Sequence, residues 1–202
     1  MGNFARTFRV RNDGADVNDD ARLIEEALAG QSVAFGHLVT KYQDRLYNTI
    51  VHVVGSPDEA SEVVQDAFVQ AFVKLESFRQ TSAFYTWLYR IAFNVAISRR
   101  RRRKPTVSID HVKEQSGVEP ASRDGEPAEP IERRERVAQV RRALAMLSEE
   151  HRSVLVLREI DGCCYETIAG ILELPIGTVR SRLHRARMEL RDQLKEVLQE
   201  EM

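Results

Sequence analysis

The sequence predicts an all-α fold of two small helical domains joined by a flexible linker, the second of them a helix-turn-helix domain. Apolar residues recur at steps of three or four through two blocks, 19–104 and 131–202, which is the period of amphipathic helices. Four of the six prolines lie between these blocks, within 105–130. Near the C-terminus, a basic amphipathic segment follows a turn that contains proline and glycine.

The composition limits the class of protein. With 202 residues, 43% of them hydrophobic, the chain can build two small cores. The 30 basic and 31 acidic residues give a formal net charge of -1, which excludes a uniformly basic surface but allows a local basic patch. No apolar run is long enough for a transmembrane helix or a signal peptide, and the two cysteines are adjacent. We therefore expect no membrane insertion, no disulfide framework and a cytoplasmic location.

The first domain is expected to span 19–104, after a disordered tail over 1–18. Its first helix, 19–29, carries acidic residues in the first turn and stops at Gly30. The second helix, 32–54, has an apolar stripe at helical spacing. The stripe consists of Phe35, Leu38, Val39, Tyr42, Leu46, Ile50 and Val53.

Two further helices complete the first domain. A Gly-Ser-Pro turn ends the second helix, and Ser56 or Asp58 can cap the third, which spans 58–76. After a short polar loop, a fourth helix carries another apolar stripe. The stripe consists of Phe84, Leu88, Ile91 and Val95.

Residues 105–130 separate the two domains. This segment combines its prolines with Gly117 and Gly125 and has few large apolar residues, so it buries too little surface to offset the entropy of ordering it. We expect a flexible linker with a root-mean-square span of about 28 Å and an extended limit near ~90 Å. It leads to the second domain, 131–202.

The second domain opens with two expected helices. Ser148 marks the start of the second of them, 150–160, and Asp161 with Gly162 ends it. The apolar positions of the first are Val137, Val140, Leu144 and Leu147.

A helix-turn-helix with a basic face follows. A short helix over 165–172 leads into 173–177, where Pro175 and Gly177 suit a tight turn. A helix that presents arginines after such a turn is the device that enters the major groove of DNA, where the guanidinium fork bonds guanine or clamps phosphates. An ordinary solvated amphipathic helix is the alternative, which the turn argues against. The apolar stripe is Val179, Leu183, Ala186 and Leu190, and the basic face holds Arg180, His184, Arg187 and Arg191, with Ser181 and Arg185 beside it.

A second basic feature, the six consecutive basic residues 99–104, ends the first domain. A solvated end of a helix at the negative pole of its dipole is one interpretation. The preceding segment, 77–98, is rich in aromatic residues, and Trp87, Arg90 and Asn94 share one flank of it. Aromatic, cationic and amide groups together suit single-stranded nucleic acid, with core packing as the alternative explanation of the aromatic residues.

Three strings in the chain resemble the bacterial RNA polymerase sigma factors of the extracytoplasmic-function (ECF) group of the sigma-70 family. They are Asp58–Phe78, Ala83–Asn94 and Leu147–Arg187, in the order of that family. The resemblance implies that the first domain is sigma region 2, which binds core polymerase and the -10 promoter element. It implies that the second domain is region 4, which binds the -35 element.

The resemblance also implies the partners of the chain. These are core RNA polymerase, through its clamp coiled coil and its flap, promoter DNA, and an anti-sigma factor as the usual control. No cofactor and no metal site are implied. No P-loop, glycine-rich nucleotide fingerprint or recognisable triad order occurs either, so we do not expect an enzyme.

By resemblance, the loop 77–83 captures a flipped-out base of the -10 element. Phe78 and Asn94 match residues that line its pocket, and Tyr89 and Ile91 support it. This agrees with the chemistry of the amide at Asn94.

The resemblance places core polymerase on the helix that contains Gln65 and Asp66, together with Tyr42 and its neighbourhood up to Tyr47. It assigns Trp87 mainly to the fold.

Six residues of the second domain match -35 contacts by the same resemblance. His184 stands where some relatives carry an aromatic residue. Cys163 and Cys164 have no counterpart in the family pattern, and we expect them to be inert core or turn residues, with redox sensing as the alternative. The base-contacting positions are Arg180, Ser181, His184 and Arg185, and Arg158 and Tyr165 touch the DNA backbone.

Two other classes of protein stay open at this point. One is a dimeric helix-turn-helix regulator that does not replace the polymerase sigma subunit; palindromic sites would support it. The other is an adaptor that binds a partner helix; loss of function on replacing Arg180 without a change in partner binding would argue against it. If the chain is a sigma factor, we expect it to bind promoters poorly alone, because nothing fixes its two domains in register until polymerase does.

Overall fold

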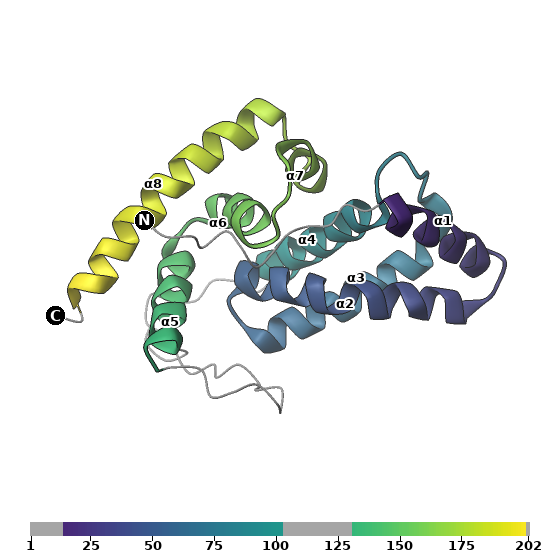
Figure 1. Ribbon diagram of the computed structural model, residues 1–202, viewed down its shortest axis with the longest axis horizontal. Helices are drawn as coiled ribbons and strands as arrows, with labels where there is room; N and C mark the ends of the chain where they lie inside the picture. The colour runs from purple at the N-terminus through teal and green to yellow at the C-terminus, as the bar shows by residue number, and fades with distance from the viewer. Residues whose placement is uncertain (1–13, 103–130, 201–202) are drawn as a thin grey trace.

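The computed structural model describes residues 14–102 and 131–200, and every regular element in these two ranges is a helix (Figure 1). The expected linker, 105–130, lies outside them. The helices form two groups, which confirms the all-α, two-domain prediction. The first group is α1 (Gly14–Leu28), α2 (Ser32–Val54), α3 (Pro57–Val73), the short 3-10 turn η1 (Leu75–Ser77) and α4 (Phe84–Arg102); the second is α5 (Ile131–Met146), α6 (Glu149–Leu155), η2 (Val156–Ile160), α7 (Tyr165–Leu172) and α8 (Ile176–Glu200).

In the first domain, α2, α3 and α4 pack on one another and α1 packs on α2. The turn after α2 is built as the sequence predicts. Gly55 adopts a left-handed conformation with φ +82°, and the Ser56 hydroxyl caps α3 by accepting a hydrogen bond from the Glu59 amide at 3.4 Å. The one difference is at the N-terminus, where α1 begins at Gly14, inside the segment expected to be a tail.

The predicted apolar stripes form the core of the first domain. Leu38, Leu46 and Ile50 of α2 are fully buried, and all four members of the α4 stripe are buried. Phe35 packs edge-on against Phe72 of α3, with ring centroids 5.1 Å apart. Helical periodicity alone thus identifies the inward faces of α2 and α4.

In the second domain, α8 packs on α5 and α6. The α5 stripe is buried only near its C-terminus, at Leu144 and Leu147, whereas Val137 and Val140 are exposed. The prediction of one continuous inward stripe is therefore wrong for the first half of α5. The reason is that this half extends past α6 and α7, beyond the core (Figure 1).

The helix expected over 150–160 changes its hydrogen-bonding pattern midway. Ser148 caps α6, with its hydroxyl accepting from the His151 amide at 3.3 Å. From Val156 onward the helix widens to a π-turn, η2, in which the Asp161 amide donates to the Val156 carbonyl at 3.0 Å. Asp161 follows directly after this π-turn and caps its end.

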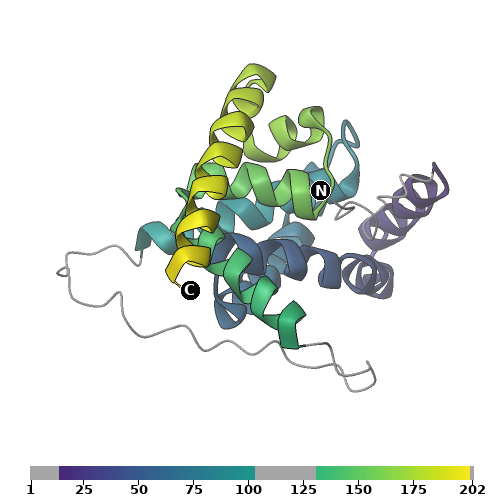
Figure 2. The ribbon, with the colours of Figure 1, turned by 60° about the vertical axis from the view of Figure 1, so that its left-hand side comes forward.

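The two domains lie against each other, with α4 against α7 and α2 against η2 and α6 (Figures 1 and 2). Their buried residues belong to one continuous cluster. The expectation that nothing fixes the two domains in register is therefore wrong for this arrangement, in which side chains of each domain bind the other. None of the described helices is long and apolar enough to cross a membrane.

Candidate nucleic-acid interface

The helix-turn-helix consists of α7 and α8, joined by a turn that does not depend on glycine. Glu173 ends α7 in a left-handed conformation with φ +54°, and the Leu174 amide donates to the Ala169 carbonyl at 3.0 Å. The Pro175 carbonyl then accepts from the amides of Thr178 and Val179 and so begins α8. Proline ahead of the helix plays its predicted part, whereas Gly177 has an ordinary backbone conformation.

The predicted DNA-contacting face of α8 is exposed along its whole length. Val179, Leu183 and Ala186 are buried against the domain, as predicted, and orient the opposite side of the helix toward solvent. Arg180 and Arg185 form no ion pair with any described residue, so their guanidinium groups are available to an anion. The exposed residues of this face are Arg180, Ser181, His184 and Arg185.

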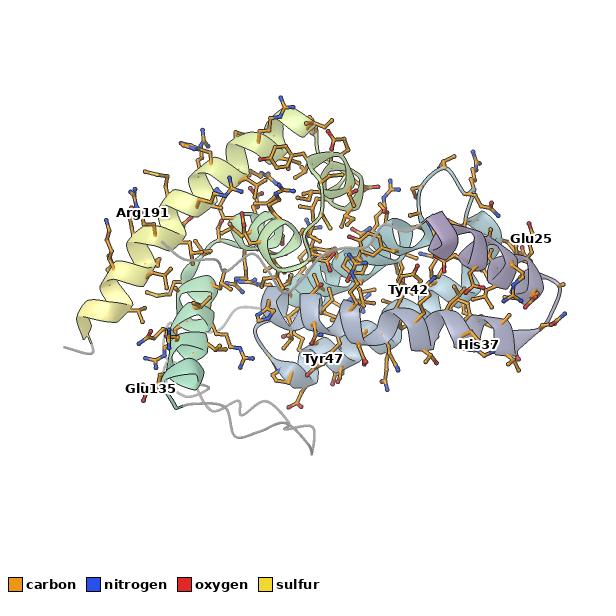
Figure 3. All side chains as sticks on the ribbon, in the orientation of Figure 1. Glu25, His37, Tyr42, Tyr47, Glu135 and Arg191 are labelled. Atoms are coloured by element: carbon orange, nitrogen blue, oxygen red, sulfur yellow. The ribbon has the colours of Figure 1, made fainter. Side chains whose placement is uncertain are left out.

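Other basic residues of α8 are held by acidic partners. Arg182 pairs with Glu150 of α6 at 2.8 Å, Arg187 pairs with Glu159 of η2 at 2.7 Å, and Arg191 pairs with Asp192 at 3.3 Å. The pairs of Arg182 and Arg187 bind α8 to the rest of the domain. Arg191 projects from the outer side of α8 (Figure 3). On the predicted basic face, Arg180 near the turn therefore has no ion pair with a described residue, whereas Arg187 and Arg191 farther along the helix are paired.

Arg158 and Tyr165 lie together beside this helix. The Arg158 guanidinium lies over the Tyr165 ring, 5.1 Å from its centroid, and donates to the Cys163 carbonyl at 2.8 Å. Both side chains are half-buried. Their predicted contact with the DNA backbone stays a prediction.

In the first domain, the residues predicted for the -10 element divide between surface and core. Asn94 is exposed, and the loop residues 79–83 are exposed as well. Phe78 is half-buried and packs on Trp87, with ring centroids 5.1 Å apart. Tyr89 and Ile91 are buried, which places them under the surface rather than in it.

Trp87 also lies 5.8 Å from the Phe84 ring, so it joins the aromatic cluster at the start of α4. The core-packing explanation therefore accounts for this aromatic residue. Asn94 and Arg90, which the sequence grouped with it, are at the surface.

The run of basic residues at the end of α4 is partly neutralised. Arg99 forms ion pairs with Glu62 and Asp66 of α3, the latter with Nη2 2.6 Å from Oδ2. These hydrogen bonds raise the pKa of Arg99. Arg100 pairs with Glu149 of the second domain at 3.5 Å, whereas Arg101 is exposed. Residues 103 and 104 lie outside the described ranges.

The residues predicted to bind core polymerase lie in three different environments. Tyr42 is buried on α2 (Figure 3), and its hydroxyl donates to Asp20 of α1 at 2.5 Å. Gln65 is exposed on α3, and Asp66 is half-buried in its pair with Arg99. The structure therefore offers Gln65 directly to a partner and places Tyr42 behind the surface, in contact with α1.

An exposed apolar patch on α3 is the feature that the sequence reasoning missed. It consists of Val69, Phe72 and Val73, which are 64%, 49% and 74% exposed. Val69 and Val73 continue the face of Gln65 at steps of four residues. That spacing, together with the buried Val64, Ala67 and Ala71 stripe opposite, was the signal that could have revealed them.

Comparisons with known proteins match this arrangement. Residues 38–106 match the model of Sigma-70 region 2, and residues 138–190 match that of Sigma-70, region 4. The RNA polymerase sigma-H factor of Pseudomonas aeruginosa is 39% identical over 186 residues, which cover 90% of this chain and 96% of that protein. The ECF RNA polymerase sigma-E factor of Escherichia coli K12 is 41% identical over 174 residues, which cover 83% of this chain and 90% of that protein.

Two solved structures are similar over most of the chain. One is the sigma factor RpoE from Bartonella quintana in complex with the anti-sigma factor NepR, with a TM-score of 0.64 and 28% identity over 80% of this chain and 96% of that one. The other is CnrH in complex with the cytosolic domain of CnrY, with a TM-score of 0.65 and 27% identity over 88% of this chain and 98% of that one.

Proposed function

The chain belongs to the extracytoplasmic-function group of the sigma-70 family of RNA polymerase sigma factors, and from this premise we propose how its residues divide the work of promoter recognition. As a sigma factor it directs core RNA polymerase to promoters in transcription initiation. Sigma factors in general are not enzymes, and we propose that this chain adds no catalysis of its own. Its place of action is then with polymerase, in the cytoplasm.

The second domain reads the -35 element through α8. The observation that carries this proposal is the exposed face with Arg180 and Arg185, whose guanidinium groups form no ion pair with a described residue, while Arg182 and Arg187 are paired and hold the helix in place. Free guanidinium groups on a fixed helix suit bidentate contacts with guanine and ionic contacts with phosphate. Ser181 and His184 complete the face, and the Arg158–Tyr165 pair contacts the adjoining backbone.

The first domain holds the unpaired -10 strand. The exposed loop after Phe78 and the exposed amide of Asn94 lie on the same domain, and the buried Tyr89 and Ile91 support them indirectly, through the packing of α4. Stacking of a base on an aromatic residue is worth about 1–3 kcal/mol, which offsets the few kcal/mol of unpairing. The chain thereby assists melting without covalent chemistry.

Core polymerase binds the α3 face that contains Gln65 and the apolar patch of Val69, Phe72 and Val73. Exposed apolar side chains of this kind mark protein interfaces. Asp66 orients its neighbour Arg99, and Tyr42 supports α2 from inside. The second domain meets the polymerase flap, as the family resemblance implies.

An anti-sigma factor controls the chain in this proposal. Support comes from the two similar solved structures, in which RpoE is bound to NepR and CnrH to the cytosolic domain of CnrY.

Transcription in vitro with purified core polymerase and a promoter library tests the whole proposal. We expect start sites that require the protein and share two spaced elements. Asn94→Ala should change the preferred -10 sequence, and Arg180→Ala should weaken use of the -35 element. Lys195→Ala, which removes an exposed cation of α8 far from the turn and outside the predicted basic face, is the matched control and should leave promoter choice unchanged. Tight duplex binding by the protein alone, with no initiation, would instead support a dimeric regulator.

A further inference from the structure

We propose that the two domains of this sigma factor close on each other through a polar latch, consisting of Asp161 of the second domain with Arg45 and Tyr85 of the first, and that this closed form covers part of α4. The existence of the closed form does not depend on the proposed function. Its consequence for promoter binding does rest on that function.

The latch is centred on a buried carboxylate whose main partners all come from the other domain. The Asp161 side chain is 5% exposed. Its Oδ1 accepts a hydrogen bond from Arg45 Nε at 2.9 Å, and its Oδ2 accepts from Arg45 Nη2 at 3.2 Å and from the Tyr85 hydroxyl at 2.8 Å. Two parallel bonds from one guanidinium fix both distance and direction. A carboxylate this deep therefore requires the first domain to be in place.

The surroundings of Asp161 reinforce this arrangement. The Arg45 guanidinium also lies over the Tyr85 ring, 4.3 Å from its centroid. Burial and the nearby Asp161 charge raise the pKa of Tyr85 and of Tyr89, so both hydroxyls remain protonated donors. Burial opposes the charge on Arg45, but its bonds to Asp161 outweigh that effect and raise its pKa.

A second contact joins the domains near the end of α2. The Arg152 side chain is buried and donates to the Val53 carbonyl at 3.1 Å across the boundary. Its remaining donors bind three carbonyl groups at the end of α5, within the second domain. Those acceptors are Leu144, Ala145 and Leu147.

A third set of contacts covers α4 itself. Arg90 Nε donates to Glu173 of the helix-turn-helix turn at 2.6 Å. One turn earlier, Thr86 lies against α7, with its Cγ2 atom 3.6 Å from where a Cβ on Gly170 would stand. Asn94 is one turn beyond Arg90 on the same face. A DNA strand that runs along Asn94 and Arg90 would therefore meet α7.

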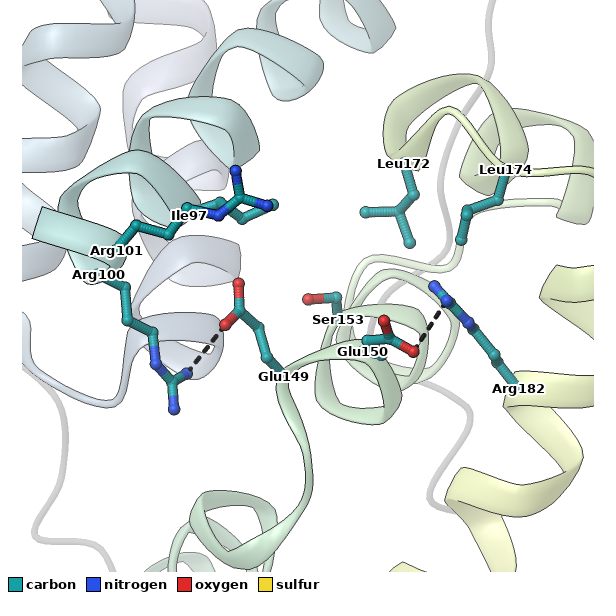
Figure 4. A pocket seen from close by; sticks show the side chains of 9 residues that line it. All are labelled: Ile97, Arg100, Arg101, Glu149, Glu150, Ser153, Leu172, Leu174 and Arg182. Carbon is teal, nitrogen blue, oxygen red and sulfur yellow. Dashed lines mark ion pairs between the residues drawn. The ribbon is translucent and has the colours of Figure 1, made fainter. Parts of the chain in front are cut away.

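Near the end of α4, the boundary between the domains is loosely packed. A cavity of about 340 Å³ lies between the end of α4 and the second domain, lined by Ile97, Arg100 and Arg101 on one side (Figure 4). Ion pairs border it, including Arg100 with Glu149. In this part of the boundary the contacts are polar and incompletely packed, as they are in transient interfaces. When the domains separate, water hydrates both Asp161 and Arg45. The intact pair therefore gives direction to docking, and removing one partner destabilises the closed form because the other charge is left buried and unpaired.

The cysteines provide a test that needs neither polymerase nor DNA. The Cys163 thiol is buried at the latch, 2.5 Å from the Tyr85 hydroxyl, whereas the neighbouring Cys164 is exposed. In full-length Cys164→Ser protein, we expect Cys163 to react slowly with a maleimide. Arg45→Ala or Tyr85→Phe in that background should speed the reaction about tenfold or more, because opening then becomes more frequent.

Arg45 and Tyr85 belong to the first domain, whereas the thiol that is measured, Cys163, belongs to the second. A change in the first domain reaches the thiol only through the closed interface. Arg22→Ala is the matched control, because it removes ion pairs with Asp19 and Glu26 on α1 and touches nothing in the second domain. Unchanged helicity by circular dichroism confirms folding. The proposal is overturned if Cys163 reacts at the same rate in the latch variants, the control and the parent.

A disulfide bond between the domains tests whether the closed form prevents initiation. Thr86→Cys with Gly170→Cys, in a Cys163→Ser and Cys164→Ser background, should join α4 to α7 when oxidised. We expect the oxidised protein to lose initiation with core polymerase and the reduced protein to regain it, with the cysteine-free parent unaffected by the oxidant. Equal initiation by the locked and reduced forms would overturn the covering role. If the parent itself never initiates, the proposed function fails while the thiol rates still decide the latch.

Discussion

Arg152 and Asp161 are both charged and buried in the second domain, and each satisfies its charge differently. Asp161 takes its ionic partner, Arg45, from the other domain. Arg152 has no carboxylate partner in its hydrogen bonds and instead donates to four backbone carbonyls. Burial therefore lowers the pKa of Arg152, since backbone carbonyls repay only part of the lost hydration. The two residues have correspondingly different consequences when replaced.

Replacing Arg152 with methionine keeps an unbranched side chain but removes every donor to the end of α5. We expect a loss of about 3 kcal/mol in the free energy of unfolding, because several buried carbonyls lose their partner at once. Urea unfolding followed by circular dichroism measures it. Arg101→Met, at an exposed position of α4, is the control and should change stability little. Equal stability of the two variants would contradict this account of the cap.

His52 should make stability depend on mildly acidic pH. Burial and the charge of Arg141 lower its pKa from 6.5 to about 4. As the pH falls below about 6.5, the unfolded chain binds a proton there that the folded chain does not accept until about pH 4, so stability decreases across that window. The loss is at most about 3 kcal/mol. Urea unfolding between pH 7.5 and 4 should show a flatter profile for His52→Gln, and an unchanged slope would exclude this histidine as the cause.

At the scale of helices, spacing of apolar residues predicted most of the secondary structure. The stripe of α4 is buried as expected, those of α2 and α8 are buried except for the half-buried Val39 and Leu190, and Ser56 caps α3. These features were predictable because they depend on residues near one another in the chain. The π-turn η2 was not predicted. Its apolar residues suit an α-helix equally well, so their spacing gives no signal for the change in hydrogen bonding.

The candidate site was predictable to the same degree. The exposed face of α8 follows from periodicity, since three buried positions, Val179, Leu183 and Ala186, define the opposite side. From the sequence, Tyr42 could lie either in the apolar core or at the surface. The packing of α1 on α2 shows that its ring is buried and that its hydroxyl donates to Asp20. Whether an aromatic residue such as Trp87 stacks on a base or on Phe78 likewise depends on the neighbouring turn.

The apolar patch of α3 allows a direct test of the polymerase contact. Val69→Glu adds a charge at a side chain that is 64% exposed, so we expect folding to be unchanged and binding to core polymerase to fall by about tenfold or more, since an uncompensated charge would be buried in the complex. Native gels or fluorescence anisotropy with core enzyme measure the affinity. Val33→Glu on α2, at another exposed valine, is the control. Equal affinity for both variants would move the contact elsewhere.

At the scale of the whole molecule, no pattern in the sequence predicts that the domains touch. Arg45, Tyr85 and Asp161 lie in three separate helical segments, and each has a sufficient local explanation: a solvated helix position, an aromatic residue among others, and a helix terminator. A contact between residues up to 116 positions apart leaves no periodic signal in either segment. The composition of 105–130 predicts independent domains, whereas complementary polar groups on the described residues bring the domains together.

The closed arrangement should couple the unfolding of the two domains. Trp87, the single tryptophan, reports on the first domain by its fluorescence, and far-ultraviolet circular dichroism reports on the helices of both domains. We expect both probes to give one urea midpoint in the parent protein and two separated midpoints in Arg45→Ala, because the latch no longer joins the domains. Coincident midpoints in the variant, with an intact fold, would show that other contacts provide the coupling.

Glu173 has two structural roles: it ends α7 in the turn of the helix-turn-helix, and it binds Arg90 of the first domain. A glutamate in a left-handed conformation is strained by roughly 1 kcal/mol, and glycine would be the more comfortable residue there. Yet only a side chain at this position can reach Arg90 on the far side of the domain boundary. A Glu173→Gly substitution would therefore relieve the backbone strain of the turn but also remove the ionic contact with Arg90 of α4. Sequence changes that improve the DNA-reading motif in isolation and those that tune its release from the other domain are not independent in this molecule.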